Sequence, residues 1–280
     1  MTWPAIQAAR RHDAAARVPF FIGSALAGSV ARAHLQALLG WPRWLRVDAA
    51  GVHLLADEPD TALQQINTQL HGQGLIRGWR DERFAVPALA DPARPLARME
   101  RAAARFWGTL TFGAHCTGWV RGGPAQPPRL WIAQRSLHKA TDPGAFDNLV
   151  GGGVPLGQTP YETLLREGWE EAGLVPEVMR RARPGRVLRL LRDIPEGLQH
   201  EWIHGFDLEL LPAESPLNQD GEVHAFRLHD AVDALAIAAA DTMTVDASLV
   251  TLDFALRHGL LAPAAAAGLE QRAARLWVTP

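Results

Sequence analysis

The stretch "GGGVPLGQTPYETLLREGWEEAGL", residues 151–174, says most about the fold of this chain. It passes from three consecutive glycines to a segment with the composition of a helix, residues 160–172, which carries two adjacent glutamates. A helix N-terminus attracts anions, which favours a phosphate-binding loop. Carboxylates close to a phosphate need a cation between them, so the same stretch also indicates a metal site.

The spacing of the acidic residues predicts one charged face on this helix. Glu167, Glu170 and Glu171 stand at i, i+3 and i+4, within an arc of about 100°. The other side of the helix carries Tyr161, Leu165, Gly168 and Ala172. We therefore expect one buried face and one face that concentrates three carboxylates. An acidic face that only contacts water is the alternative.

Two widespread glycine motifs fail at this loop. Gly152 and Gly157 have the spacing of a nucleotide-binding P-loop, but Gln158 stands where the phosphate-binding lysine is required. The dinucleotide-binding fingerprint fails as well, because Leu156 occupies a position that needs glycine. The glycines therefore need another explanation.

The stretch resembles the Nudix box. That pattern is a glycine, five residues, a glutamate, seven residues, Arg-Glu, a hydrophobic residue, any residue, two glutamates, any residue, a glycine and a hydrophobic residue. The matching positions are Gly152, Arg166, Glu167, Glu170, Glu171, Gly173 and Leu174. Gln158 replaces the first glutamate, and we expect it to hydrogen-bond the arginine without neutralising it. Gly168 replaces a hydrophobic residue and is expected to permit a close approach to the sheet.

The resemblance implies an enzyme that hydrolyses a diphosphate linked to another group, with Mg²⁺ or Mn²⁺ as cofactor. It assigns Glu167, Glu170 and Glu171 to the metal, with the carbonyl oxygen of Gly152 as a further ligand. Arg166 counts with the glutamates among the catalytic residues. The metal would neutralise phosphate charge and lower the pKa of the attacking water.

Residues outside the box supply further candidates. Glu222, in "NQDGEVHAF", is a candidate metal ligand or general base, with a solvated loop glutamate as the alternative. Arg135 and Lys139 are candidate diphosphate contacts, because each offers positive charge just upstream of the glycines. His115 and Trp119 are candidates to face a ring system of the substrate, and core positions are the alternative.

The sequence on either side of the box resembles one particular subgroup of Nudix proteins. "GAHCTGWV" (113–120), "LWIAQRSLHKATDPGAFDNLVGGG" (130–153) and "DASLVTLDFALRHGLL" (246–261) are similar to Nudix proteins related to the hydrolase half of fungal thiamine pyrophosphokinase. The similarity implies action on thiamine diphosphate or its oxidised forms, with release of the monophosphate and phosphate. Two alternatives stay open. One is a generic nucleoside-diphosphate-linked pyrophosphatase, and the other is a catalytically silent Nudix binding module.

The resemblance also predicts the architecture: an α/β (α+β) fold in which a Nudix α/β/α sandwich with a mixed sheet follows a smaller N-terminal α/β domain. We place the boundary so that residues 1–108 form the accessory domain and residues 109–280 the Nudix domain. In the first part we expect a strand at 18–22, a helix at 29–40, a hairpin at 44–56, a helix at 60–74 capped by Asp60 or Thr61, and a proline-rich break at 86–100. In the second we expect strands at 109–120, 129–136, 186–194 and 200–210 and helices at 160–172, 230–238 and 246–259, the last capped by Asp246.

One stretch matches the zinc protease signature HExxH: "HEWIH", residues 200–204. That motif needs a helix to bring both histidines to one metal. Here apolar and polar residues alternate with a period of two, which is typical of a strand. On a strand His200 and His204 would lie about 13 Å apart, too far for one zinc ion.

Composition limits the partners. The chain has 280 residues and a formal net charge of −2, so no overall positive field attracts nucleic acid or an anionic membrane. No stretch approaches the roughly 20 apolar residues of a membrane helix. Cys116 is the only cysteine, which suits a reducing cytoplasm. We expect a cytoplasmic enzyme with a small-molecule diphosphate substrate, and both a monomer and a homodimer stay open.

Overall fold

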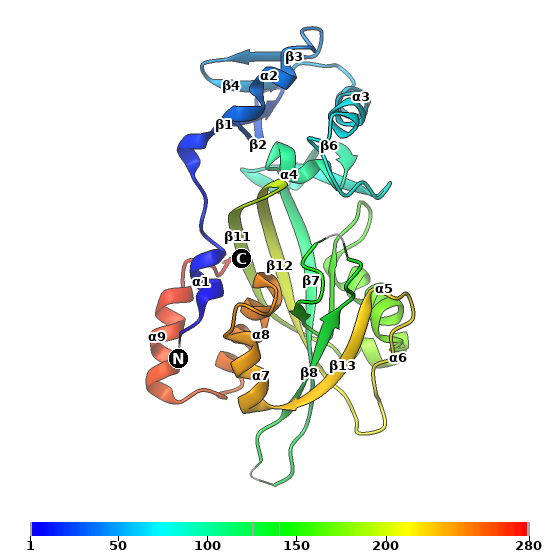
Figure 1. Cartoon of the computed structure of the whole chain (residues 1–280), viewed down its shortest axis with the longest axis vertical. Coiled ribbons are helices and arrows are strands. Elements are labelled where there is room, and N and C mark those ends of the chain that lie inside the picture. Colours follow the sequence, from blue (N-terminus) through cyan, green and yellow to red (C-terminus); the bar gives the residue numbers. More distant parts are fainter. Residues whose placement is uncertain (1, 125, 140, 279–280) are drawn as a thin grey trace.

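The computed structural model describes residues 2–124, 126–139 and 141–278. Its elements form two units stacked along the longest axis of the molecule (Figure 1). The N-terminal unit comprises residues 14–108 and the C-terminal unit comprises the elements from residue 109 onwards. The prediction of a mixed α/β chain with an N-terminal α/β part is confirmed.

A seven-stranded mixed sheet forms the centre of the C-terminal unit, in the order β11-β12-β7-β8-β13, with β10 paired to β7 and β9 to β8. Strand β12 runs parallel to β7, and the other pairs are antiparallel. The strands are β7 (Leu110–Val120), β8 (Arg129–Arg135), β9 (Phe146–Asp147), β10 (Val150–Gly153), β11 (Arg183–Ile194), β12 (Gly197–Glu209) and β13 (Val223–Asp230).

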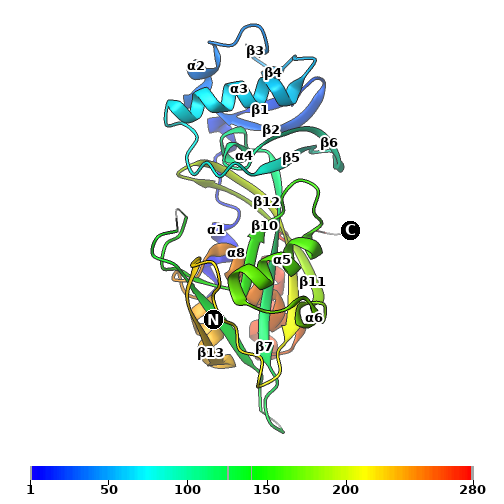
Figure 2. The same ribbon diagram turned by 90° about the vertical axis from the view of Figure 1, so that its right-hand side faces the viewer.

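Helices cover both faces of this sheet, and Figures 1 and 2 show them on opposite sides. One face carries α5 (Pro160–Ala172) and α6 (Pro176–Met179), packed on buried residues of β7 such as Ala114 and Cys116. The other carries α7 (Ala231–Ala238), α8 (Val245–Arg257) and α9 (Pro263–Ala273). Two apolar cores therefore enclose the sheet, as predicted for an α/β/α sandwich.

The N-terminal unit has its own apolar core. A four-stranded sheet in the order β2-β1-β4-β3 packs with helix α3, and a two-stranded hairpin follows. Its elements are η1 (Ala14–Ala16), β1 (Arg17–Ile22), β2 (Ala25–Ala31), η2 (Arg32–His34), α2 (Leu35–Leu38), β3 (Leu45–Asp48), β4 (Gly51–Leu54), α3 (Pro59–Gly72), β5 (Arg83–Ala88), β6 (Asp91–Glu100) and α4 (Ala103–Trp107).

Two local predictions for this unit are wrong. Residues 29–31 continue strand β2 and are not helical, because Val30 pairs with Val18 across the sheet and both side chains are buried. The proline-rich passage is the hairpin β5–β6 and not a break. Pro87 and Pro95 face each other where the register shifts, and such an irregularity tolerates residues without a backbone N–H.

The first residues of the chain pack against the C-terminal unit. Helix α1 (Pro4–Ala8) contributes to the same core as α8, and the indole N–H of Trp3 donates to the hydroxyl of Ser248 at 2.9 Å. The carbonyl oxygen of Ala9 accepts from the N–H of Leu191 at 2.8 Å. The boundary at residue 108 stays a prediction, but the start of the chain belongs to the second core. Within the described residues, no helix combines the length and apolar character needed to cross a bilayer.

Candidate active site

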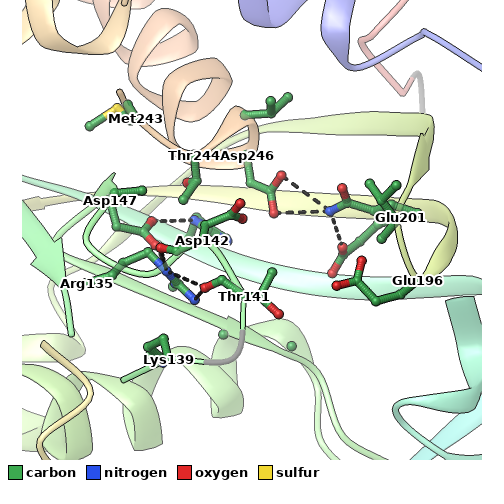
Figure 3. A pocket seen from close by; sticks show the side chains of 18 of the residues that line it. Arg135, Lys139, Thr141, Asp142, Asp147, Glu196, Glu201, Met243, Thr244 and Asp246 are labelled. Carbon is green, nitrogen blue, oxygen red and sulfur yellow. Dashed lines mark hydrogen bonds and ion pairs between the residues drawn. The ribbon is translucent and has the colours of Figure 1, made fainter. Parts of the chain in front are cut away.

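A cavity of about 550 Å³ lies where the glycine strand β10, helix α5 and the N-terminal unit meet. Its wall includes Gly151, Gly152 and Gly153 of β10, and Glu167 and Glu171 of α5. Figure 3 shows other side chains of the wall, among them Arg135 and Lys139. The cavity therefore contains most of the candidate residues named from the sequence.

Local sequence determines where α5 starts and stops. Thr159 caps the helix: its hydroxyl accepts from the N–H of Glu162 at 3.2 Å, and its own N–H donates to the Glu162 carboxylate at 2.8 Å. Pro160 occupies the first turn, where no N–H is needed. Gly173 ends the helix with a φ of +62°, a conformation that glycine adopts without strain.

The glycines let the β10 backbone approach its neighbours closely. A Cβ atom at Gly152 would lie 2.3 Å from Oε1 of Glu167, and one at Gly151 would lie 2.7 Å from Cε1 of His115. The N–H of Gly151 donates to the Glu171 carboxylate at 3.1 Å. A side chain at position 152 would push the Glu167 carboxylate away from the backbone, so this close approach requires glycine.

The box arginine holds two of the three carboxylates. Arg166 donates to Glu167 at 2.9 Å and to Glu170 at 2.6 Å. Burial raises the pKa of Glu167, and the adjacent Arg166 opposes that rise. Burial also raises the pKa of Glu171 to about 8, and the negative charge of Glu167 adds to the effect. Burial and the neighbouring carboxylate therefore disfavour the ionised form of Glu171 unless a cation lies nearby.

This donor set fits a hard divalent cation. Carboxylate oxygens are the ligands that Mg²⁺ and Mn²⁺ prefer. Among the described residues, no three acidic, histidine or cysteine side chains already converge as a ready metal cage. Arg166 occupies oxygens of Glu167 and Glu170, while Glu171 is buried with a raised pKa, so a cation would relieve the repulsion that the protein itself leaves.

The two departures from the box have different structural consequences. The Nε–H of Arg166 donates to Oε1 of Gln158 at 3.4 Å, as predicted, although this bond is long. The expectation for Gly168 is wrong: a Cβ there would lie 2.5 Å from Cε of Met179, so this glycine makes room for helix α6 and not for the sheet.

Glu222 lies at the cavity and is not a freely solvated loop residue. It accepts a hydrogen bond from Nζ of Lys139, which also lies 3.8 Å from Glu171. Burial opposes ionisation of Glu222, but the hydrogen bond and charge of Lys139 outweigh it, and the pKa is lowered. The structure therefore brings both predicted residues to the site and keeps Glu222 ionised.

Arg135 also lines the cavity, but its guanidinium is already engaged. It donates to Asp147 at 2.8 Å and to the carbonyl oxygen of Thr141 at 2.9 Å (Figure 3). Its clearest role is to hold the loop that follows β8. The prediction that it contacts the diphosphate stays a prediction.

Only one of the two residues predicted to contact a substrate ring borders the cavity. His115 is 7% exposed, borders the cavity and shares a hydrogen bond of 3.2 Å with Asn148 through Nδ1. Trp119 does not line this cavity, which corrects the expectation that it faces a substrate ring. It packs against Phe254 and His258 in the core under helix α8, because it lies on the same face of β7 as His115 but four residues, about 13 Å, further along the strand.

The HExxH stretch lies on a strand, as its alternation predicted. His200 and His204 both belong to β12, in register with residues of β7 and β11. His200 is 9% exposed, and burial lowers its pKa to about 4. A neutral, buried strand histidine argues against the zinc protease interpretation.

Sequence reasoning missed a second set of carboxylates on the far side of the cavity. This acidic wall consists of Asp142, Glu196, Glu201 and Asp246 (Figure 3). The Nε2 amide of Gln199 bridges Glu201 at 3.0 Å and Asp246 at 3.3 Å. Its members are distant in sequence and follow no local spacing. Asp246 had been expected to cap α8, but Thr244 takes that position and leaves Asp246 at the cavity.

Cations from the N-terminal unit were also missed. Arg80, Arg101 and Arg105 line the same cavity as the glycine strand. They come from the loop before β5, from the residue after β6 and from α4. No sequence signal pointed to them, since their approach depends on how the two units pack.

Comparisons with known proteins agree with this geometry. Residues 119–250 match the NUDIX domain model, and residues 2–111 match the model described as Domain of unknown function (DUF4743). Over 256 residues the chain is 32% identical to Nudix hydrolase 24, chloroplastic, from Arabidopsis thaliana. The aligned residues make up 88% of this chain and 69% of that protein. The chain is 34% identical over 225 residues to Nudix hydrolase 20, chloroplastic, from the same plant, covering 78% and 59%. Among solved structures, DR0079 from Deinococcus radiodurans aligns with a TM-score of 0.48 and 23% identity over 62% of this chain and 99% of that one.

Proposed function

Since this chain belongs to the Nudix hydrolase family, whose members act on diphosphate bonds, we propose that its substrate is thiamine diphosphate or an oxidised analogue. Water attacks one phosphorus atom, the bridging P–O bond breaks, and the products are the monophosphate and phosphate. The proposed cofactor is Mg²⁺ or Mn²⁺. We also propose a cytoplasmic location, because the single cysteine, Cys116, is a buried free thiol suited to a reducing compartment.

The observation that carries this proposal is the two-ended character of the cavity. One end holds the α5 carboxylates with Lys139, and the other is the acidic wall. Thiamine diphosphate would complement both ends, because a divalent cation held by the α5 carboxylates would bind its diphosphate and the acidic wall would face its cationic thiazolium. Burial and the nearby carboxylate of Asp246 raise the pKa of Asp142 and of Glu201, so a cationic ring at this wall would favour their ionised forms. The volume of about 550 Å³ suits a small organic ligand.

The chain's own residues divide the chemical work. Glu167, Glu170 and Glu171 would hold the metal, together with the carbonyl oxygen of Gly152. When bound, the cation neutralises phosphate charge and lowers the pKa of the attacking water. Arg166 keeps Glu167 and Glu170 oriented on the helix. Glu222, ionised beside Lys139, is the proposed acceptor of the proton that the water loses.

A phosphate-release screen tests the substrate. Thiamine diphosphate, its oxidised forms, ADP-ribose and dinucleoside polyphosphates are compared with Mg²⁺ and with Mn²⁺. We expect the highest kcat/KM with a thiamine compound. A higher kcat/KM with a nucleotide compound would replace this proposal with a nucleoside-diphosphate-linked pyrophosphatase, and no turnover with any compound would favour a binding module.

A variant of the acidic wall links the screen to the structure. Asp246→Asn should raise KM for thiamine diphosphate roughly tenfold, since it removes a charge that faces the cationic ring. It should change KM for ADP-ribose much less. Asp233→Asn, at an exposed position of α7, is the control and should change neither. Equal effects of Asp246→Asn on both substrates would contradict the assigned orientation.

A further inference from the structure

The N-terminal unit is fixed against the glycine strand through backbone contacts. The carbonyl oxygen of Arg83 accepts from the N–H of Leu156 at 2.8 Å, just beyond β10. A Cβ at Gly153 would lie 2.8 Å from Cζ of Phe84, so the ring packs directly on the strand. Arg80, in the loop just before β5, is held in addition by its backbone N–H, which donates to the Glu100 carboxylate at 3.1 Å.

Two arginines of the N-terminal unit face the acidic helix from this position. Arg80 and Arg101 line both the main cavity and a smaller adjoining hollow, whose wall also includes Glu167 and Glu170. A Cβ at Gly153 would lie 3.3 Å from Nη2 of Arg101, which places that guanidinium against the glycine strand. Arg105 lies elsewhere in the cavity, 3.8 Å from Glu196, and balances the acidic wall.

The guanidinium groups of Arg80 and Arg101 retain unused donors. Within the described residues, the Arg80 side chain has one ion contact, 3.7 Å from Glu222, which exceeds hydrogen-bond distance. Arg101 donates from Nη1 to Glu82 at 2.8 Å, and its other guanidinium nitrogens form no hydrogen bond with a described residue.

A structural arginine elsewhere in the chain looks different. Arg257 donates to Asp207 at 2.6 and 2.7 Å and to Asp253 at 2.8 Å, so all three of its nitrogens are engaged. The contrast matters because guanidinium donors that a protein leaves unpaired inside a cavity are available to an anionic ligand.

We propose that the N-terminal unit binds the phosphate groups of the substrate through Arg80 and Arg101. The inference rests on the proposed function in one respect, namely that the substrate is a diphosphate. A planar guanidinium matches two phosphate oxygens at once, and the carboxylates of α5 on the opposite wall would hold the cation that the same phosphates share. The catalytic site is then incomplete without the N-terminal unit.

A purely structural role for Arg101 is the competing explanation. Its guanidinium lies over the Phe84 ring, 5.4 Å from the centroid, and its pairing with Glu82 joins two segments of the same unit. Loss of these contacts would lower stability without changing anion affinity. Arg80 has no such packing and its side chain is 38% exposed, so its substitution separates the two explanations.

The test measures binding of methylenediphosphonate, whose P–C–P bridge resists hydrolysis, by calorimetry in Mg²⁺ with the full chain. Arg80→Gln and Arg101→Gln should each weaken binding by roughly 10- to 100-fold, as expected for loss of a charge-assisted contact. Arg101→Lys should recover part of the affinity, because it keeps the charge without the planar fork. Arg98→Gln is the matched control: Arg98 lies on β6, is 58% exposed and pairs with Asp60, so affinity should stay within about twofold.

Thermal melting of each variant accompanies the titrations. Unchanged affinity in natively folded Arg80→Gln and Arg101→Gln overturns the inference, and if Arg101→Gln fails to fold, Arg80→Gln decides alone. Thiamine diphosphate hydrolysis is measured separately on the unmodified protein. Absence of that hydrolysis together with weaker diphosphonate binding in the variants refutes the substrate proposal and supports the arginine assignment. Hydrolysis of thiamine diphosphate together with unchanged diphosphonate binding in the variants refutes the arginine assignment and supports the substrate proposal.

Discussion

Gly152→Ala should disable the site while leaving the fold intact. The new Cβ would lie 2.3 Å from Oε1 of Glu167, whereas ordinary contact begins near 3.4 Å, so the carboxylate has to move by about 1.1 Å. A displacement of about 1 Å in a catalytic group costs on the order of 10²-fold in rate, about 3 kcal/mol of barrier. The Gly152 carbonyl oxygen is retained in the variant, and the residue does not have a positive φ, so the effect isolates the position of Glu167.

The assay is metal-dependent phosphate release, with a titration of Mg²⁺ and a thermal melt for each protein. Gly268→Ala serves as the control, because a Cβ there meets no atom within 4 Å and the position lies in helix α9. We expect the control to keep full activity and to gain up to about 1 kcal/mol of stability from helix propensity. Wild-type turnover and metal affinity in Gly152→Ala would refute the role given to the close contact between β10 and Glu167.

Three further predictions follow from the site. Glu170→Gln and Glu171→Gln should each lower kcat at least about 10²-fold with folding preserved, and near-normal turnover in both would remove the metal assignment. Gln158→Glu should raise metal affinity or turnover by a factor of about 2–20, because a charged acceptor attracts Arg166 more strongly, and identical metal titrations would rule this out. The pKa of His200 is 6.5 in the unfolded chain and about 4 in the folded protein. Between these two pH values only the unfolded chain binds the proton, so the free energy of unfolding falls as the pH falls below 6.5. In denaturant unfolding, the loss of stability between pH 7 and pH 5 should be smaller by about 1.5–2 kcal/mol in His200→Gln. Hydrolysis should stay within about tenfold. A pH dependence of unfolding equal to that of the unmodified protein would contradict the buried neutral state.

Features set by local chemistry could be predicted from the sequence. The spacing of Glu167, Glu170 and Glu171 predicted helix α5, because it depends on residues within two turns. The alternation around His200 gave strand β12 in the same way. The structure bears out these elements because the local preference and the tertiary packing agree.

Features that depend on packing between distant segments could not be predicted. Val30 sits in a segment with helical composition, yet its pairing with Val18 makes it a strand residue. Arg80 and Asp246 reach one cavity from positions far apart in the chain, with no common spacing to mark them. Trp119 shows the same limit, because it shares a face of β7 with His115 and only the place of the cavity along the strand decides that His115 borders it.

The charge balance around Arg166 leads us to expect that the departure at Gln158 changes the strength of the proposed metal site and not its existence. Three carboxylates within one arc repel one another and destabilise an isolated helix. Arg166 offsets part of that repulsion from the same helix, through short contacts to Glu167 and Glu170. Gln158 accepts only a long hydrogen bond from it, so most of the guanidinium charge stays with those two glutamates. A metal ion then has to compete with Arg166 for their oxygens, whereas the buried carboxylate of Glu171 is free of that competition. All three carboxylates remain in place, so we expect the substitution to weaken a cation site there without removing a ligand.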